Sequence, residues 1–335
     1  MQGDTRLNST NRRTAIVRSL LAWGASSLPC GFALAQQYPS KTIRIVIPFS
    51  PGGPSDLIAR LIAQKLSDAW NQSVIVDNRP GASGIVGADL VAKAAPDGHT
   101  LLVINQLLVQ VSALYNKVPF DPLRDFIPIT DIFSSPLWLA INTGKSDART
   151  MAEFVAQVKS QPRTHSYASV GNGSIGSLYG FKLNAVAGLD MVHVPYKGAG
   201  PVVQALLGGE VSASFVDYAT LKAHMGGGKL RALAVSAPAR SPWTPDVPTF
   251  TEQGFPGFEA FSWVGVFVAA KTPPDIVEKV TAEIMKALKQ PDIVAKLNEL
   301  ALTQGAMPRD RFAAMVNADH TRWEAVIKAA GMKLE

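Results

Sequence analysis

The sequence predicts an α/β fold built as two units, each a mainly parallel sheet flanked by helices. Short apolar runs rich in Val and Ile alternate with segments of helical periodicity, which is the pattern of buried parallel strands and their crossover helices. Glycine-rich turns repeatedly separate the two kinds of segment. The chain has 335 residues, of which 47% are hydrophobic and 17% charged, so it suits one large or two medium domains. This composition excludes a disordered chain and a coiled coil.

The first unit is expected to end near residue 138. Its strands are predicted at 42–47, 74–77, 101–104 and 126–134, with a helix over 85–95. Another helix should begin at Ser55, a good N-cap residue. The apolar residues of that helix fall on one face: Leu57, Ile58, Leu61, Ile62 and Leu66.

The second unit is expected between residues 139 and 260. Strands are predicted at 137–141, 166–169, 191–194, 211–216 and 230–235. Thr150 and Glu153 form a capping box that opens a helix, a second helix starts near Ile175, and a third ends at Leu207. A Pro-rich stretch over 241–258 has no clear period, and 260–269 returns to a strand. Helices over 274–289, 292–299 and 309–330 have no sheet of their own and must pack on one of the units.

The first 35 residues have the organisation of a secretory signal peptide. Arg12, Arg13 and Arg18 precede a short apolar core, and Ala33 and Ala35 supply the small residues before a cleavage site. We expect cleavage after Ala35 and a periplasmic mature protein. An uncleaved anchor is disfavoured because a spanning helix needs about 20 apolar residues. The arginine pair leaves both the general and the twin-arginine export routes open.

The charges of the chain do not indicate a nucleic-acid-binding protein. Residues 1–35 hold four arginines against one aspartate, which accounts for half of the net charge of +6. The remaining basic residues are scattered, and Arg12-Arg13 is the only adjacent basic pair. A nucleic-acid-binding protein needs a concentrated basic face. Cys30, the one cysteine, lies in the segment expected to be removed, so no disulfide is expected.

Motifs of catalysis and cofactor binding are incomplete. Gly171, Gly173 and Gly176 follow a strand and open a helix, as in the dinucleotide fingerprint, but the next predicted strand does not end in the required acidic residue. No G-x-S-x-G motif is present, and the five histidines contain no H-x-x-x-H pair. The sequence therefore predicts no catalytic or metal-binding residue and no cofactor.

Four glycine-rich or small-residue loops follow predicted strands, at 50–56, 78–84, 169–174 and 196–200. Ligands of open α/β sheets bind beyond the carboxyl ends of the strands, where free backbone N–H groups at helix starts attract anions. Such loops suit a small carboxylate. The competing interpretation, that the glycines only permit tight turns, stays open for any single loop.

A series of segments identifies a resemblance to a known family. The segments are Tyr38 to Arg44, Pro48 to Asp56, Asp77 to Ala82, Ala95 to Gly98, Tyr167 to Ser169, His193 to Gly198 and Pro245 to Thr249. In this order and spacing they resemble the extracytoplasmic solute receptors of tripartite tricarboxylate transporters, the Bug or TctC-type family. The resemblance covers essentially the whole mature chain.

The resemblance implies a two-domain periplasmic-binding-protein fold of type II, the Venus flytrap. Domain 1 would comprise 36–138 and 261–335, and domain 2 would comprise 139–260, after a signal peptide over 1–35. The implied function is capture of a small carboxylate between the domains and its delivery to two integral-membrane transporter subunits. A monomer without a cofactor is expected.

The resemblance also implies the binding residues. The first loop runs from Ser50 to Asp56, the facing loop from Ser169 to Ser174, and Asp217 matches a recurrent aspartate of the family. Ser50 and Gln106 lie at positions that depart from the family pattern or cannot be assigned to it. The candidate ligand-binding residues are Ser50, Pro51, Gly52, Gly53, Ser55, Asp56, Gln106, Ser169, Gly171, Gly173, Ser174 and Asp217.

Two alternatives remain on the same fold: a secreted enzyme, and the periplasmic ligand-binding partner of a sensor. The missing catalytic residues and the export signal favour the receptor. We expect neutral dipoles to hold the carboxylate, with Arg79 as a turn residue at the rim of the site.

Overall fold

The computed structural model describes residues 38–49, 51–196, 199–258, 262–329 and 331. The predicted signal peptide and Ser50 lie outside the described residues. By its internal contacts the chain divides into Met1–Ser40 and Lys41–Glu335, and the second of these units holds both sheets. No described helix is both long enough and apolar enough to cross a bilayer.

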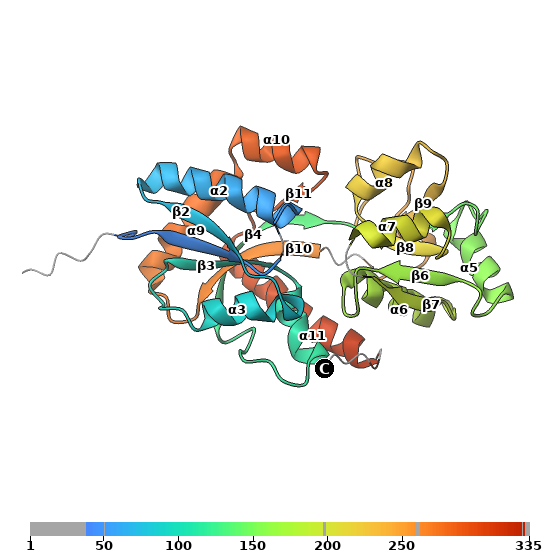
Figure 1. Cartoon of the computed structure of the whole chain (residues 1–335), viewed down its shortest axis with the longest axis horizontal. Coiled ribbons are helices and arrows are strands. Elements are labelled where there is room, and N and C mark those ends of the chain that lie inside the picture. The colour runs from blue at the N-terminus through green and yellow to red at the C-terminus, as the bar shows by residue number, and fades with distance from the viewer. Residues whose placement is uncertain (1–37, 50, 197–198, 259–261, 330, 332–335) are drawn as a thin grey trace, which may run out of the picture. The chain divides into compact units, whose positions relative to one another are not determined.

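The first sheet has six strands in the order β11-β4-β10-β3-β1-β2 (Figure 1). Their bounds are β1 (Ile43–Ile47), β2 (Val74–Asn78), β3 (Thr100–Asn105), β4 (Phe126–Ser135), β10 (Ser262–Ala269) and β11 (Thr303–Gln304). β1 pairs in parallel with β2 and β3, whereas β10 runs antiparallel to β3 and β4. The carboxyl ends of β1, β2 and β3 therefore meet at one edge.

The second sheet has five strands in the order β7-β6-β8-β5-β9. Their bounds are β5 (Trp138–Asn142), β6 (Ser166–Ser169), β7 (Val192–Pro195), β8 (Ala213–Val216) and β9 (Leu230–Val235). β6 pairs in parallel with β7 and β8, and β5 runs antiparallel to β8 and β9. The α/β class with two helix-flanked, mainly parallel sheets is thus confirmed. In the first sheet β1, β2, β3 and β4 run in one direction and β10 and β11 oppose them, and in the second sheet β5 opposes the other strands. The antiparallel pairs involve β4, β5 and β10, the strands next to the points where the chain passes from one sheet to the other.

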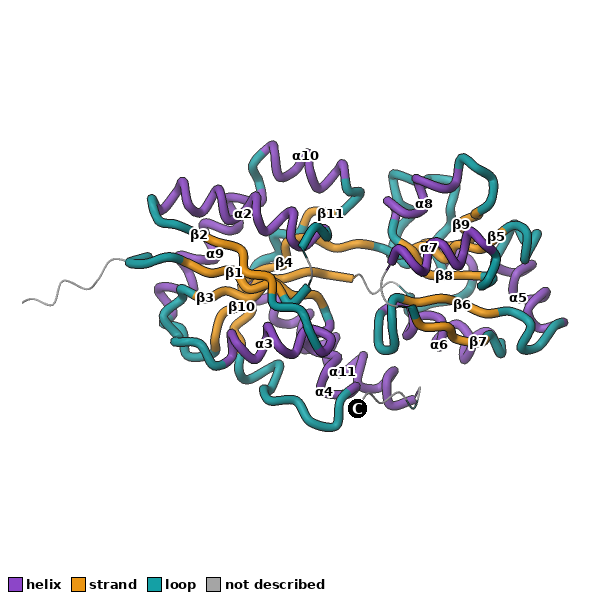
Figure 2. Tube along the Cα trace, viewed as in Figure 1, coloured by secondary structure: helices purple, strands orange, loops and turns teal. Residues whose placement is uncertain are grey.

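Helices flank both sheets (Figures 1 and 2). Those beside the first sheet are α2 (Pro54–Trp70), α3 (Ile85–Ala92), α4 (Leu107–Leu114), α9 (Pro274–Leu288), α10 (Pro291–Glu299) and α11 (Arg309–Ala329). Those beside the second are α5 (Met151–Ser160), α6 (Ile175–Ala187), α7 (Ala199–Gly208) and α8 (Tyr218–Met225). Single 3₁₀ turns lie at Ala82–Gly84 and Thr251–Gln253. The closing helices α9, α10 and α11 pack on the first sheet or its helices, as expected.

The side chains of strand β5 show that the second sheet is covered on both faces. Successive side chains of a strand point to opposite faces, so Trp138 and Ala140 join one apolar cluster while Leu139 and Ile141 join another. All four are fully buried. A strand that is apolar on both faces gives the continuous run seen in the sequence.

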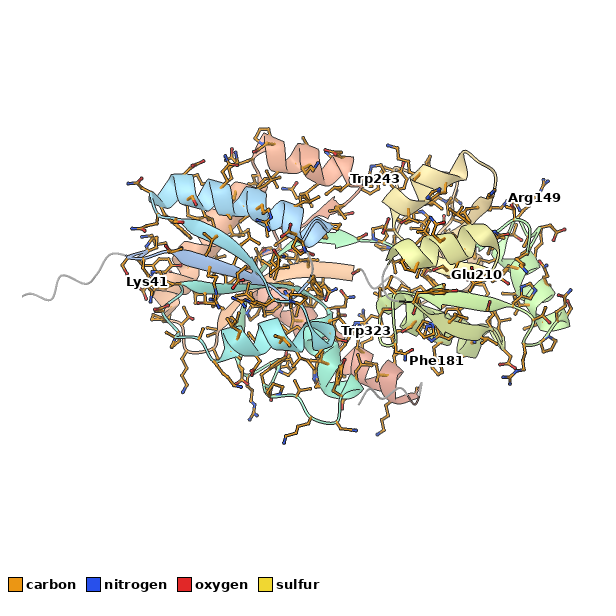
Figure 3. The ribbon with its side chains drawn as sticks, viewed as in Figure 1. Lys41, Arg149, Phe181, Glu210, Trp243 and Trp323 are labelled. Carbon is orange, nitrogen blue, oxygen red and sulfur yellow. The ribbon has the colours of Figure 1, made fainter. Side chains whose placement is uncertain are left out.

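The Pro-rich stretch covers one end of the second sheet. Trp243, labelled in Figure 3, packs on Tyr218 with ring centroids 5.8 Å apart, and Tyr218 packs on Trp138 at 5.7 Å. The indole of Trp138 donates to the Thr244 hydroxyl at 2.9 Å. Side-chain packing, rather than backbone periodicity, orders this segment.

Two expected helix starts have different outcomes. The Thr150 hydroxyl accepts a hydrogen bond from Glu153 N at 3.2 Å, which confirms the start of α5. The expectation that Ser55 caps α2 is wrong. Gly53 occupies the N-cap and Pro54 is the first helical residue. Proline suits that position because its fixed φ is helical and its missing N–H has no partner there anyway.

Candidate functional site

The predicted residues fall into two groups, one at the edge of each sheet where parallel strands end. Pro51, Gly52, Gly53, Ser55 and Asp56 follow β1, and Gln106 follows β3. The loop 169–174 follows β6, and Asp217 follows β8. Ligands of α/β sheets bind at such edges.

The Asp56 carboxylate holds the first loop in shape. It accepts hydrogen bonds from Gly52 N at 3.0 Å, from Asn78 Nδ2 at 3.0 Å and from the Arg60 guanidinium at 2.9 and 3.0 Å. Asn78 also donates to the carbonyl of Phe49 at 3.1 Å. Asp56, only 3% exposed, therefore links β1, β2 and α2 around the loop.

The charge of Asp56 is balanced within this cluster. Burial alone raises the pKa of a carboxyl group, but hydrogen bonds from Arg60, Gly52 and Asn78 outweigh it and hold the pKa of Asp56 below its ordinary value. Asp56 is thus an anion at neutral pH, and its oxygens are taken by donors. Asp56 supports the loop and leaves the loop backbone to meet a ligand.

The loop itself presents backbone to open space. Gly52 has φ +92°, a conformation that favours glycine, and a Cβ on Gly52 or Gly53 would meet no atom within 4 Å. The first N–H groups of a helix have no intrahelical acceptor. Pro54 has no N–H, and among the described residues those of Ser55 and Asp56 have no acceptor, so they can bind an anion.

Cations near the first loop are already paired. The Arg60 guanidinium binds Asp56 and Asn78, and the Arg79 guanidinium binds the Asp77 carboxylate at 3.0 Å. Both arginine side chains are about half exposed. The loop thus offers mainly uncharged donors.

Gln106 lies at the same edge of the first sheet. It is 2% exposed, and its carbonyl accepts a hydrogen bond from the Ser262 hydroxyl at 3.1 Å. Its neighbour Asn105 accepts from Leu107 N and so helps to begin α4. The side-chain oxygen of Gln106 is therefore held by Ser262, the first residue of β10.

The Ser169 side chain holds the backbone of the second loop, residues 169–174, through hydrogen bonds. Its hydroxyl donates to the Gly171 carbonyl at 3.0 Å, accepts from Gly171 N at 3.3 Å, and lies 2.7 Å from His193 Nε2. A hydroxyl has one proton, so His193 donates from Nε2 when Ser169 donates to Gly171. Ser169 is 1% exposed. The glycines of the loop, at φ +132° for Gly171 and +77° for Gly173, carry the turn.

Ser174 and Asp217 begin helices. The Ser174 hydroxyl donates to the Gly171 carbonyl at 2.7 Å and accepts from Ser177 N at 3.4 Å, at the start of α6. One Asp217 oxygen accepts from Thr220 N at 2.8 Å, at the start of α8. Ser174 is the N-cap of α6, whose start at Ile175 is as expected from the sequence.

An apolar pocket of about 170 Å³ lies at this edge of the second sheet. Its walls come from the ends of β6 and β8 and the starts of α6, α7 and α8. The lining residues are Leu137, Val170, Ile175, Gly176, Val202, Val203, Phe215, Val216, Asp217 and Thr220. Among them, Asp217 and Gly176 belong to sequence motifs and Ile175 was expected to begin a helix, whereas the others look like ordinary core residues.

The Ser169–His193 pair is not arranged as a hydrolase site. The serine hydroxyl is buried and already bonded to the loop, whereas a nucleophile must reach substrate. Burial lowers the pKa of His193, and the ring stacks on Tyr167 with centroids 4.9 Å apart. Within the part of the chain that the structure describes, no group of three His, Cys, Asp or Glu side chains is placed to hold a metal ion.

Supporting residues that the sequence analysis did not single out are Arg60, Asn78 and His193. Asn78 and His193 lie in segments that carry the family resemblance, but their bonding partners are in other elements. No sequence signal identifies these partners.

The chain is similar to known proteins over most of its length. The model of the family described as the tripartite tricarboxylate transporter family receptor, TctC, matches residues 58–332. A protein encoded in the tcbD-tcbE intergenic region of Pseudomonas sp. strain P51 is 37% identical over 315 residues, covering 92% of this chain and 93% of its own. BugT of Bordetella pertussis is 34% identical, covering 97% and 99%.

Solved structures show the same similarity. An R. palustris protein described with adipate superposes with a TM-score of 0.77 at 31% identity, covering 89% of this chain and all of its own. MatC of Rhodopseudomonas palustris, described with bound malate, gives 0.74 at 33% identity, covering 87% and all of its own.

Proposed function

Because the chain belongs to the tripartite tricarboxylate transporter receptor family, a family of solute-binding receptors rather than enzymes, we propose that it captures a small carboxylate in the periplasm and delivers it to two integral-membrane subunits. The carboxylate binds between domain 1, formed by 36–138 and 261–335, and domain 2, formed by 139–260. The receptor acts as a monomer after removal of residues 1–35.

The observation that carries the proposal is the chemistry of the two loops. Each follows the carboxyl end of a parallel strand and begins a helix, so backbone N–H groups point outward from it. The side chains nearest the loops, those of Asp56, Arg60, Ser169 and Ser174, are bonded within the protein. What remains for a ligand is a set of neutral, preorganised donors, which suits a carboxylate.

Ligands of related structures support the same class. The related R. palustris structures were described with adipate and malate, which are small carboxylates. Neither compound is thereby identified as the ligand of this chain.

The test is a thermal-shift screen of the exported protein against a library of carboxylic acids, followed by calorimetry on each hit. A ligand at about 100 times its dissociation constant should raise the free energy of unfolding by about 2.7 kcal/mol. Incubation with each hit should leave it chemically unchanged. Turnover of a hit would refute the receptor in favour of an enzyme, and a library without any binding acid would refute carboxylate capture.

A further inference from the structure

Resting on the proposed function, we propose that this receptor selects monocarboxylates with an uncharged apolar body, an aromatic ring or a saturated chain, and that the apolar pocket beside α6, α7 and α8 holds this body. The carboxylate of the ligand binds the loop backbone, and its other end carries no second carboxylate.

The walls of the pocket are hydrocarbon. The side chains of Val202, Phe215 and Val216 are each more than nine-tenths buried, and their apolar atoms line the pocket. Val170 is 50% exposed at its mouth. A hydroxylated or charged group placed against these walls loses its hydrogen bonds to water without replacement, which is costly. An apolar group gains by leaving water.

The size of the pocket fits such a body. A cavity of about 150 Å³ lined by Leu, Ile and Phe side chains holds one benzene molecule in another protein. The pocket here is about 170 Å³ and has a similar lining. One six-membered ring or a saturated chain of similar volume therefore fills it.

The charge at the pocket opposes a second carboxylate. Asp217 and Thr220 are its polar lining residues, and Asp217 is its one ionisable side chain. One oxygen of Asp217 accepts the N–H of Thr220. Among the described residues, the pocket lining includes no lysine, arginine or histidine that could neutralise another anion. Two carboxylates in this confined space repel each other more strongly than they would in water.

The carboxylate of the ligand has a separate place close by. Val170, Ile175 and Gly176 line the pocket and flank the loop of Gly171 to Ser174 along the chain. A ligand whose apolar body fills the pocket can thus present its one carboxylate to the N–H groups at the start of α6. The ligands with which the related structures are described, adipate and malate, are diacids.

Calorimetry with matched acids tests the proposal. Hexanoate is compared with adipate and benzoate with terephthalate, with citrate as a hydroxylated triacid. We expect each monoacid to bind at least about tenfold more tightly than its diacid, and citrate to bind more weakly than either monoacid. Tighter binding of adipate, terephthalate or citrate would overturn the selectivity while leaving the proposed function standing. If none of the five acids binds, this proposal is refuted, whereas carboxylate capture itself is decided by the library screen.

Asp217→Asn is the matched variant. Asparagine caps a helix as well as aspartate does, so α8 should keep its start while the charge is lost. The variant should bind adipate and terephthalate about tenfold more tightly than the parent does, so that the ratio of diacid to monoacid affinity rises. An unchanged ratio of diacid to monoacid affinity, with the thermal midpoint preserved, would refute the role of Asp217.

Val203→Thr tests the apolar wall. Val203 lines the pocket and is half-buried, and threonine has nearly the same shape but adds a hydroxyl. Benzoate affinity should fall several-fold, because a bound ring would bury the added hydroxyl without a hydrogen bond. Benzoate binding identical to that of the parent would show that the ring lies elsewhere.

Discussion

Gly52 and Gly53 form a natural pair for testing the first loop. In both, the space where a Cβ would lie holds no atom within 4 Å, so neither substitution to alanine creates a clash within the protein. The backbone conformations differ. Gly52 has φ +92°, whereas Gly53 has φ −77° and ψ 169°, which any residue adopts.

The two alanine variants should therefore differ in stability. Gly52→Ala forces a non-glycine residue to positive φ, which costs about 1–3 kcal/mol. Gly53→Ala restricts the unfolded chain, which stabilises the protein by about 0.4–1 kcal/mol, but alanine is a poorer N-cap of α2 than glycine by a similar amount, so the two effects offset each other. We expect the free energies of unfolding of the two variants to differ by about 1–3 kcal/mol, measured by denaturant titration of the exported protein.

Ligand affinity should follow a different order. The Gly52 N–H is already donated to Asp56, whereas the structure assigns the Gly53 N–H no acceptor among the described residues. A methyl group on Gly53 hinders a carboxylate that approaches this N–H. Gly53→Ala should thus weaken binding about tenfold while the protein stays as stable as the parent.

Two results would contradict this reasoning. Equal destabilisation by both substitutions would mean that the backbone conformations are not as described. Parental affinity in Gly53→Ala, measured by calorimetry with any confirmed ligand, would mean that the first loop does not touch the ligand.

Three further predictions concern residues that support the site. Asp56→Asn should lower the free energy of unfolding by about 2 kcal/mol in denaturant titration, because the Arg60 guanidinium loses its charged partner; a parental midpoint would contradict the loop-holding role. Ser174→Ala should lower the free energy of unfolding by about 1 kcal/mol, because α6 loses its N-cap. It should also weaken ligand binding more than Arg79→Ala does, since Arg79 is already paired with a carboxylate. The reverse order of affinities in calorimetry would move the anion site to Arg79. Burial lowers the pKa of His193, so as the pH falls the imidazole becomes protonated in the unfolded chain before it does so in the folded protein, and the free energy of unfolding should decrease below about pH 6.5. His193→Gln should make the melting temperature depend less steeply on pH, and an equally steep dependence in the variant would contradict this.

Local patterns determined much of the fold. The strands were recognisable because a strand buried on both faces, such as β5, must be apolar at every position. Two eight-residue helices, α4 and α8, were not predicted. α4 is apolar around most of its surface and so lacks the one-sided stripe by which a helix is recognised.

Strand direction was beyond the reach of those patterns. Parallel and antiparallel neighbours place the same alternation of side chains on the two faces, and only the path of the chain decides which forms. The antiparallel pairing of β10 with β3 and β4 joins segments more than 100 residues apart. The alternation of strands and helices predicted the mainly parallel sheets, whereas nothing local identified β5, β10 and β11 as the reversed strands.

The candidate site divides in the same way. The glycine-rich loops and their places after strands were recognisable in the sequence, because a turn at positive φ favours glycine at that position whatever surrounds it. Only the tertiary structure decided that Asp56 is bonded to Asn78, 22 residues away, and that valines and a phenylalanine from several elements form one pocket. Backbone conformation is a local property of each residue, whereas a hydrogen-bond partner or a pocket wall depends on which distant segments the folded chain brings together.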